Sequence, residues 1–203
     1  TPAAAARNRL WSMLAPLVTA AATASSLEYA AISGGHHLLI GPSGAGKSTL
    51  LHAVCRRAAR EGVTVIRLSC YDLVNGRTSL RAALSAHASA AGANLRLVHL
   101  EHLELFCHDD ATSVSFSLAD GCASRGAKNL ASQLRLASET PFVAIACVRD
   151  ARRLPLCLRA HGAFDTEPLF VPPPSARERR KLLEAVLLSS AKAECDDAEA
   201  HRA

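Results

Sequence analysis

Short apolar runs recur along the chain and alternate with longer stretches that have helical spacing. The runs are continuous, and one of them is rich in β-branched residues, which is typical of strands buried between two layers of helices. Strands that alternate with helices predict a parallel sheet with right-handed crossover connections, so the predicted fold class is α/β. Five strands are predicted, at residues 38–40, 63–68, 95–100, 142–147 and 169–171.

The segments between these runs predict the helices. A leading helix is expected within 10–24, where Pro16 and several Ser and Thr leave too few strongly apolar residues for a membrane span. After three prolines, Ser175 and Glu178 form the pattern of a capping box at the start of a last helix. Other helices are expected to run to about residue 60 and to span 79–90 and 129–137, with a polar loop at 107–127.

A phosphate-binding motif follows the first predicted strand. The pattern G-x-x-x-x-G-K-[ST], placed between a strand and a helix, binds nucleoside triphosphates, because its glycines let backbone N–H groups turn toward the phosphates. Lys47 is expected to reach the β- and γ-phosphates and Ser48 to offer its hydroxyl to Mg²⁺. The motif predicts ATP and Mg²⁺ as ligands, bound by Gly41, Pro42, Ser43, Gly44, Ala45, Gly46, Lys47, Ser48 and Thr49.

Composition narrows the class of protein. With 203 residues, 49% of them apolar and only 20% charged, the chain can form about one globular domain. The net charge of +5 would suit nucleic acid, but the basic residues are spread out and only 4% of residues are aromatic, so no nucleic-acid partner is expected. Seven cysteines without a C-x-x-C pair predict neither a disulfide framework nor a zinc site and favour a reducing cytosol. The chain begins at Thr1, which suggests a piece of a longer protein.

An unusual pair of residues ends the third predicted strand. NTPases of this kind place an acidic residue there to hold Mg²⁺, often followed by a glutamate that activates the attacking water. Glu101 occupies the metal-side position, where aspartate is usual, and could hold Mg²⁺ through water. His102 occupies the position of the catalytic glutamate, where imidazole is a poor substitute. Slow or absent hydrolysis is therefore predicted.

The same region is rich in residues that ligate transition metals. Strand alternation places His99 and Glu101 on one face and His102 on the other, so these side chains are not expected to converge on an ion. The prediction for His99 is a core or helix-facing histidine. No cysteine is assigned a chemical role, because free cysteines often pack simply as small core residues.

Motif spacing resembles that of the AAA family. ABC-type ATPases insert a helical domain with a Leu-Ser-Gly-Gly signature between the phosphate loop and the acidic strand, and this chain has no such signature. The stretch 97–106 is similar to the AAA pattern of an apolar strand followed by acids. Arg159 matches the first arginine-finger position, which would act on a neighbouring subunit. Two positions depart from the pattern: Ala163 replaces the second finger, and Val148-Arg149 stand in place of a sensor asparagine.

Within AAA proteins, the chain looks like the first ATPase module of the peroxisome biogenesis factor one family. The similar passages are 67–77, which lacks an aromatic pore loop, the strand 142–146 without a sensor asparagine, and the prolines 172–174. The resemblance implies a nucleotide-binding subdomain at 1–171 and the first helix of a truncated α-helical lid at 172–203. It implies a heterohexameric double ring with a factor-six-like AAA subunit, at the cytosolic face of the peroxisomal membrane and reaching it only through an adaptor. There, ATP binding would support ring assembly while the ring recycles the import receptor.

Two other functions remain open at the level of sequence. In a competent AAA ATPase or a phosphoryl transferase, Glu104, Asp109 or Asp110 would supply the carboxylate that His102 lacks. A nucleic-acid loader of the AAA class would use the positive charge and would show steeply salt-dependent binding.

Overall fold

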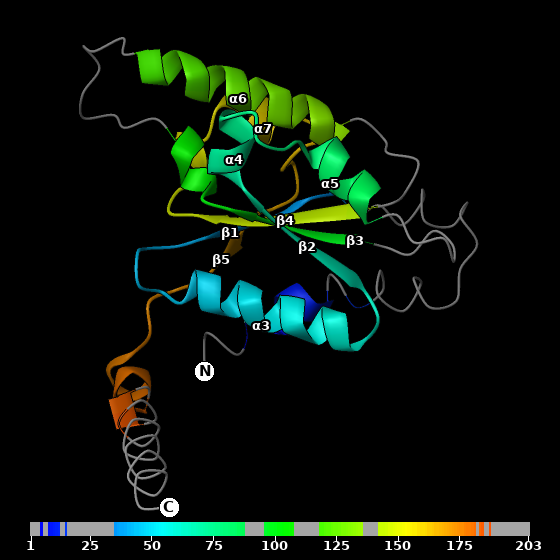
Figure 1. The fold of residues 1–203 in the computed structure, drawn as a ribbon. Helices are drawn as coiled ribbons and strands as arrows, with labels where there is room; N and C mark the ends of the chain where they lie inside the picture. The colour runs from blue at the N-terminus through cyan, green and yellow to red at the C-terminus, as the bar shows by residue number, and fades with distance from the viewer. Residues whose placement is uncertain are drawn as a thin grey trace, which may run out of the picture.

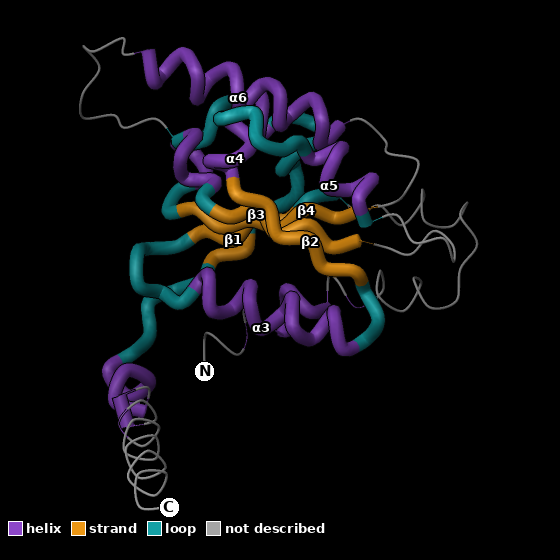
Figure 2. Tube along the Cα trace, viewed as in Figure 1, coloured by secondary structure: helices purple, strands orange, loops and turns teal. Residues whose placement is uncertain are grey.

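The structure, a computed structural model, describes residues 35–87, 96–107, 118–135 and 142–181, together with positions 5, 8–12, 15, 183, 184 and 187. Within these residues the fold is three-layered, with a central sheet that has α3 and residues 8–12 on one side and α4, α5, α6 and α7 on the other (Figures 1 and 2). The predicted α/β class is confirmed.

The sheet contains five strands, all parallel, in the order β2-β3-β4-β1-β5. Each lies where an apolar run predicted it, with boundaries displaced by at most one residue. Because β1 lies between β4 and β5, the connections after β1 and after β4 leave on opposite sides of the sheet (Figure 1). Such a switch in strand order opens a crevice at the carboxyl ends of the strands. The strands are β1 (His37–Ile40), β2 (Thr64–Ser69), β3 (Arg96–Glu101), β4 (Phe142–Val148) and β5 (Leu169–Phe170).

One helix covers the lower face of the sheet in Figure 1. This helix, α3 (Lys47–Arg60), buries an apolar stripe against the inner side chains of β1, β3 and β4. Part of the predicted leading helix also packs here: Leu10 is fully buried in the same cluster, and the Arg57 guanidinium lies 3.9 Å from the centre of the Trp11 ring. Positions 13, 14 and 16–24 of this predicted helix lie outside the described residues. The stripe on α3 consists of Leu51, Val54, Cys55 and Ala58.

The opposite face is covered by a larger apolar cluster under several helices. Ser79 caps α5 (Leu80–Ala86) by accepting a hydrogen bond from the Ala82 N–H at 3.1 Å, so the predicted helix there is confirmed as far as residue 86. The short α4 directly after β2 was not predicted. The elements on this face are α4 (Cys70–Val74), α5, α6 (Leu118–Arg135), α7 (Leu156–Arg159) and the 3-10 turns η1 (Leu103–Phe106) and η2 (Ala151–Arg153).

The predicted loop at 107–127 is wrong for its last ten residues, because α6 begins at Leu118. Its polar composition and two glycines indicated turns, but burial of a helical stripe at Ala127, Leu130, Ala131 and Leu134 outweighs that local preference. Residues 108–117, in the same predicted loop, lie outside the described residues.

A buried histidine just before β1 connects this strand to β4 and to the end of α6 by hydrogen bonds. The Nδ1 of His36 accepts a hydrogen bond from the Ala144 N–H at 3.0 Å, so its Nε2 carries the proton and donates to the Leu134 carbonyl at 3.2 Å. The ring also stacks on Phe142, with centroids 5.1 Å apart. Burial lowers the pKa of His36, and the neutral ring already satisfies both nitrogens.

The last described helix starts at the predicted capping box. The Glu178 N–H donates to Ser175 Oγ at 3.3 Å, and Glu178 Oε2 accepts from the Ser175 N–H at 2.8 Å. The helix lies apart from the sheet in Figure 1, and its Leu183 and Leu187 side chains are exposed. A boundary at 171/172 between a nucleotide-binding subdomain and a lid stays a prediction.

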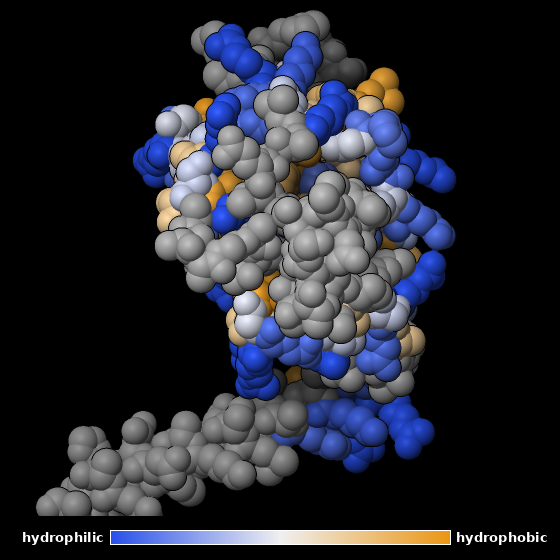
Figure 3. Space-filling model, turned by 90° about the vertical axis from the view of Figure 1, so that its right-hand side faces the viewer, coloured by the Kyte–Doolittle hydropathy of each residue, from blue (hydrophilic) through white to orange (hydrophobic). Residues whose placement is uncertain are grey.

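On the face shown in Figure 3, the described surface is mostly hydrophilic, and its hydrophobic residues form small separate patches. Among the described helices, none combines the length and the apolar character needed to cross a bilayer.

Candidate nucleotide-binding site

The predicted phosphate loop lies at the carboxyl edge of the sheet, between the ends of β1, β4 and β5. The Gly41 N–H donates to the Arg149 carbonyl at 3.3 Å. A Cβ on Gly41 would lie only 2.2 Å from the Val171 carbonyl oxygen, so this position accepts only glycine. The Val171 N–H in turn donates to the Ile40 carbonyl at 2.7 Å. The loop is therefore held against main chain on both sides before it turns into α3.

The loop leads into a helix that carries no cap of its own. Gly46 is the N-cap residue of α3 with φ 84°, it offers no side-chain cap, and the first turn has no acidic residue. The first backbone N–H groups of a helix have no partner within the helix, and they carry the positive end of its dipole. The start of α3 thus offers amides and positive potential to an anion.

Lys47 brings a full positive charge into the same place. Its side chain is buried, and its ammonium group donates to the Gly41 carbonyl at 2.8 Å and to the Pro42 carbonyl at 2.9 Å. Anionic phosphate oxygens form stronger, charge-assisted hydrogen bonds than neutral carbonyls do. The ammonium is therefore positioned to exchange these partners for phosphate oxygens.

A pocket of about 530 Å³ opens above the loop. Six of the nine predicted binding residues line it, whereas Gly41, Pro42 and Ala45 are not among its lining residues. The carbonyls of Gly41 and Pro42 accept hydrogen bonds from the Lys47 ammonium instead. The lining residues that the phosphate-loop motif did not indicate come from α4, from β4 and from the turns that follow β3 and β4. The lining consists of Ser43, Gly44, Gly46, Lys47, Ser48, Thr49, Tyr71, His102, Glu104, Leu105, Cys147 and Arg149.

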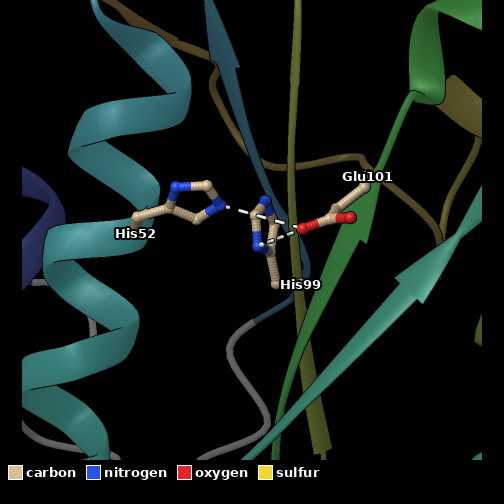
Figure 4. A group of neighbouring side chains, drawn as sticks. All are labelled: His52, His99 and Glu101. Atoms are coloured by element: carbon tan, nitrogen blue, oxygen red, sulfur yellow. Dashed lines mark ion pairs between the residues drawn. The ribbon is translucent and has the colours of Figure 1, made fainter.

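Glu101, the residue predicted to hold Mg²⁺ with Ser48, does not line this pocket. It lies on the α3 side of β3, where its Oε1 is 3.7 Å from His52 Nε2 and 3.8 Å from His99 Nδ1 (Figure 4). Ser48 does line the pocket, and its hydroxyl lies 3.8 Å from Cys147 Sγ. A role for Glu101 at Mg²⁺ stays a prediction, and it requires the carboxylate to leave the two histidines.

His102 lies at the predicted place of the catalytic glutamate and lines the pocket. It has φ 60° in the left-handed region, which is uncommon for a residue other than glycine, and its ring centroid is 5.2 Å from that of Tyr71. An exposed imidazole beside an aromatic ring therefore lines the pocket, and its correspondence to the water-activating glutamate stays a prediction.

A comparison with protein-family models gives one match, to the family described as "ATPase family associated with various cellular activities (AAA)", over residues 37–170. The chain belongs to the AAA family. The match runs from the start of β1 to the end of β5 and contains the whole phosphate loop and pocket. A search of curated proteins found no match to this chain. Membership of the family makes the chain an ATP-binding AAA module, and AAA nucleotide sites typically use a divalent metal.

In this AAA module, Glu104 is the carboxylate among the described pocket-lining residues. Its Oε2 lies 3.6 Å from Nε of Arg149, which stands where a sensor asparagine was expected. Both side chains are more than 40% exposed, so the pair contributes little to stability, and either partner is free to reorient toward a ligand. Asp109 and Asp110, the other predicted alternatives, lie outside the described residues.

Cys147 and Tyr71 were not singled out as pocket residues by the motif analysis. Burial raises the pKa of Cys147, so its thiol stays protonated beside Ser48 even though Lys47 opposes this shift. The available signal was positional: side chains at the carboxyl ends of neighbouring parallel strands meet at one edge of the sheet.

Arg159 ends α7 on the surface of the AAA module and does not line the pocket. Its guanidinium Nε donates to the Leu154 carbonyl at 3.0 Å. An arginine finger acts on the nucleotide of a neighbouring subunit, so distance from its own pocket is compatible with that role. The role stays a prediction.

Proposed function

We propose that this AAA module binds Mg-ATP in the pocket and holds it with little or no turnover. The observation that carries the proposal is the placement of the Lys47 ammonium inside the loop, at the uncapped start of α3. The backbone amides and the ammonium would bind the β- and γ-phosphates, and Ser48 would contact Mg²⁺.

The proposal of weak hydrolysis rests on the residues that lie opposite the phosphate loop. Phosphoryl transfer to water depends on a group that positions or deprotonates the water, and general base catalysis contributes about 10²–10⁴-fold to a rate. His102 lines the pocket and would take the place of that group, while the Glu101 carboxylate lies toward α3. Bound ATP would therefore persist and act as a structural ligand.

We further propose a place for the module in a peroxisome biogenesis double-ring ATPase that recycles the matrix-protein import receptor. The support is the sequence resemblance at 67–77, 142–146 and 172–174. A second, factor-six-like AAA subunit would complete a heterohexameric ring, Arg159 would reach the pocket of the neighbour, and the ring would act at the cytosolic face of the peroxisomal membrane through an adaptor. This role is tested by measuring whether the two purified subunits form a ring only when ATP is present. Ring formation to the same extent without ATP would contradict it.

A competent ATPase is the second candidate, because Glu104 lines the pocket. Steady-state turnover separates the two. We expect slow hydrolysis by the wild type, still slower hydrolysis by Lys47→Ala, and faster hydrolysis by His102→Glu. The proposal is overturned if the assembled wild-type ring hydrolyses ATP rapidly and His102→Ala abolishes that hydrolysis. If hydrolysis is rapid and Glu104→Gln abolishes it while His102→Ala does not, the second candidate is established.

A further inference from the structure

Three potential metal ligands meet between α3 and β3, outside the nucleotide pocket. His52 comes from α3, one turn after Ser48, while His99 and Glu101 come from the same face of β3 (Figure 4). Both histidine rings direct a nitrogen toward the Glu101 carboxylate, and the three ligand atoms lie within 4.8 Å of one another. The set contains two imidazoles and one carboxylate, which are ligand types that Zn²⁺ accepts.

His99 gives the second, independent indication of a ligand. Its side chain is 3% exposed, and within the described part of the chain its buried Nδ1 has no hydrogen-bond partner. Glu101 Oε1 lies 3.8 Å from this nitrogen, which is too long for a hydrogen bond. A buried nitrogen without a partner costs about 1–3 kcal/mol, so such atoms in folded proteins usually have one. A cation between the ring and the carboxylate would supply that partner.

The spacing is close to what such an ion needs. Ligands at about 2.0–2.2 Å from a tetrahedral Zn²⁺ lie about 3.3–3.6 Å from one another. The observed separations from Glu101 Oε1 are 3.7 Å to His52 and 3.8 Å to His99, and all three ligand atoms lie within 4.8 Å of one another, so shifts of about 1 Å or less would close the site. The side chains of His52 and Glu101 are 43% and 33% exposed, which leaves an entry path and room for water at the fourth position.

One nearby charge opposes a cation. Arg67 on β2 pairs in register with His99, and its positive charge acts on that ring. The negative charge of Glu101 offsets it at shorter range. The balance favours a metal that forms directional bonds to neutral imidazole, such as Zn²⁺, over Mg²⁺ or Ca²⁺, which prefer oxygen ligands.

We propose that His52 Nε2, His99 Nδ1 and a Glu101 carboxylate oxygen bind one Zn²⁺ ion, with water as the fourth ligand. The site is separate from the phosphate loop and does not depend on nucleotide binding. It shares one residue with the predicted Mg²⁺ position, so a bound Zn²⁺ would keep the Glu101 carboxylate on the α3 side of β3.

The test is a titration of the whole chain with Zn²⁺ and with Co²⁺, without nucleotide, against a competing chromophoric chelator. We expect one ion per chain, and we expect His52→Ala and Glu101→Gln each to weaken binding at least tenfold. The matched control is His87→Ala, because His87 is the exposed C-cap residue of α5 and its Nδ1 lies 2.9 Å from the Ala83 carbonyl oxygen, on a helix outside the proposed site. Its affinity should equal that of the wild type, and circular dichroism should show all variants folded.

The seven cysteines could bind the same ions, so the ligand shell must also be measured. X-ray absorption of the Co²⁺ or Zn²⁺ form should show nitrogen and oxygen neighbours, with imidazole scattering that diminishes in His52→Ala. A shell of sulfur ligands, affinity unchanged in His52→Ala and Glu101→Gln, or no binding at all would each overturn the proposal. In the last case the three side chains are neighbours that share no ion.

Discussion

Replacing Gly41 by alanine should release the phosphate loop from the end of β5. A Cβ at this position would lie 2.2 Å from the Val171 carbonyl oxygen and 3.2 Å from its carbonyl carbon. Both atoms belong to the main chain, and the Val171 N–H is bonded to the Ile40 carbonyl at 2.7 Å, so the obstacle cannot rotate away. Either the loop or the end of β5 must move.

The loss of unfolding free energy in Gly41→Ala has two contributions. Alanine at a positive φ costs on the order of 1–3 kcal/mol, and forcing an extra methyl group into packed atoms costs about 1–3 kcal/mol more. Gly62→Ala is the matched control, because Gly62 has φ 86° and nothing within 4 Å of its added Cβ. Only Gly41→Ala incurs the second cost, so its Tm should lie about 2–12 °C below that of Gly62→Ala.

Urea and thermal unfolding of both variants measure this difference, and titration with Mg-ATP adds a functional measurement. Gly41→Ala should bind Mg-ATP more weakly than the wild type, whereas Gly62→Ala, at the far end of α3, should bind it equally well. Equal unfolding free energies for the two variants would refute the reasoning, since they would show that β5 does not hold the loop in place.

Three further predictions come from other parts of the fold. Burial lowers the pKa of His36 from its ordinary 6.5, so below pH 6.5 the unfolded chain binds a proton that the folded chain does not. The stability that His36 contributes is therefore present above pH 6.5 and is lost as the pH falls toward the lowered pKa of the folded state. His36→Gln should flatten this part of a plot of unfolding free energy against pH. Burial raises the pKa of Cys70 to about 12, so iodoacetamide should leave Cys70 unmodified in the native protein and modify it after unfolding, as mass spectrometry would show. Arg135 donates to two main-chain carbonyls around α7, at 2.7 and 3.0 Å. Arg135→Ala should cost about 1–2 kcal/mol of unfolding free energy in a denaturant titration, while Lys128→Ala on the same helix should cost less than half of that.

The parts of the fold that depend on local pattern could be predicted from the sequence. The continuous apolar runs predicted all five strands, and the phosphate-loop motif predicted the junction of β1 and α3. Both predictions were possible because each signal lies within a few neighbouring residues. The start of α6 could not be found this way. Two glycines lie in its first half, and the helix is stabilised by packing on α4, α5, α7 and η1, with a close approach of Gly126 to Val74 and Phe106.

The composition of the site depended on contacts between distant segments. Strand alternation correctly separated His102 from His99 and Glu101, but it could not show that His52 on α3 completes a cluster with the latter two. Nor could it show which acid reaches the pocket, because Glu101 ends on the α3 side and Glu104 arrives through the left-handed turn at His102. The position of a carboxylate in a motif does not determine the direction of its side chain.

The most direct test of this account is calorimetric titration of the folded chain with Mg-ATP, compared with Lys47→Ala and with Lys128→Ala as a charge-matched control. Loss of one charge-assisted contact worth about 1.5–3 kcal/mol should weaken binding by Lys47→Ala about 10- to 150-fold. The wild type and Lys128→Ala should bind one ATP per chain with equal affinity. No binding by well-folded wild-type protein, or equal affinity in Lys47→Ala, would contradict the account.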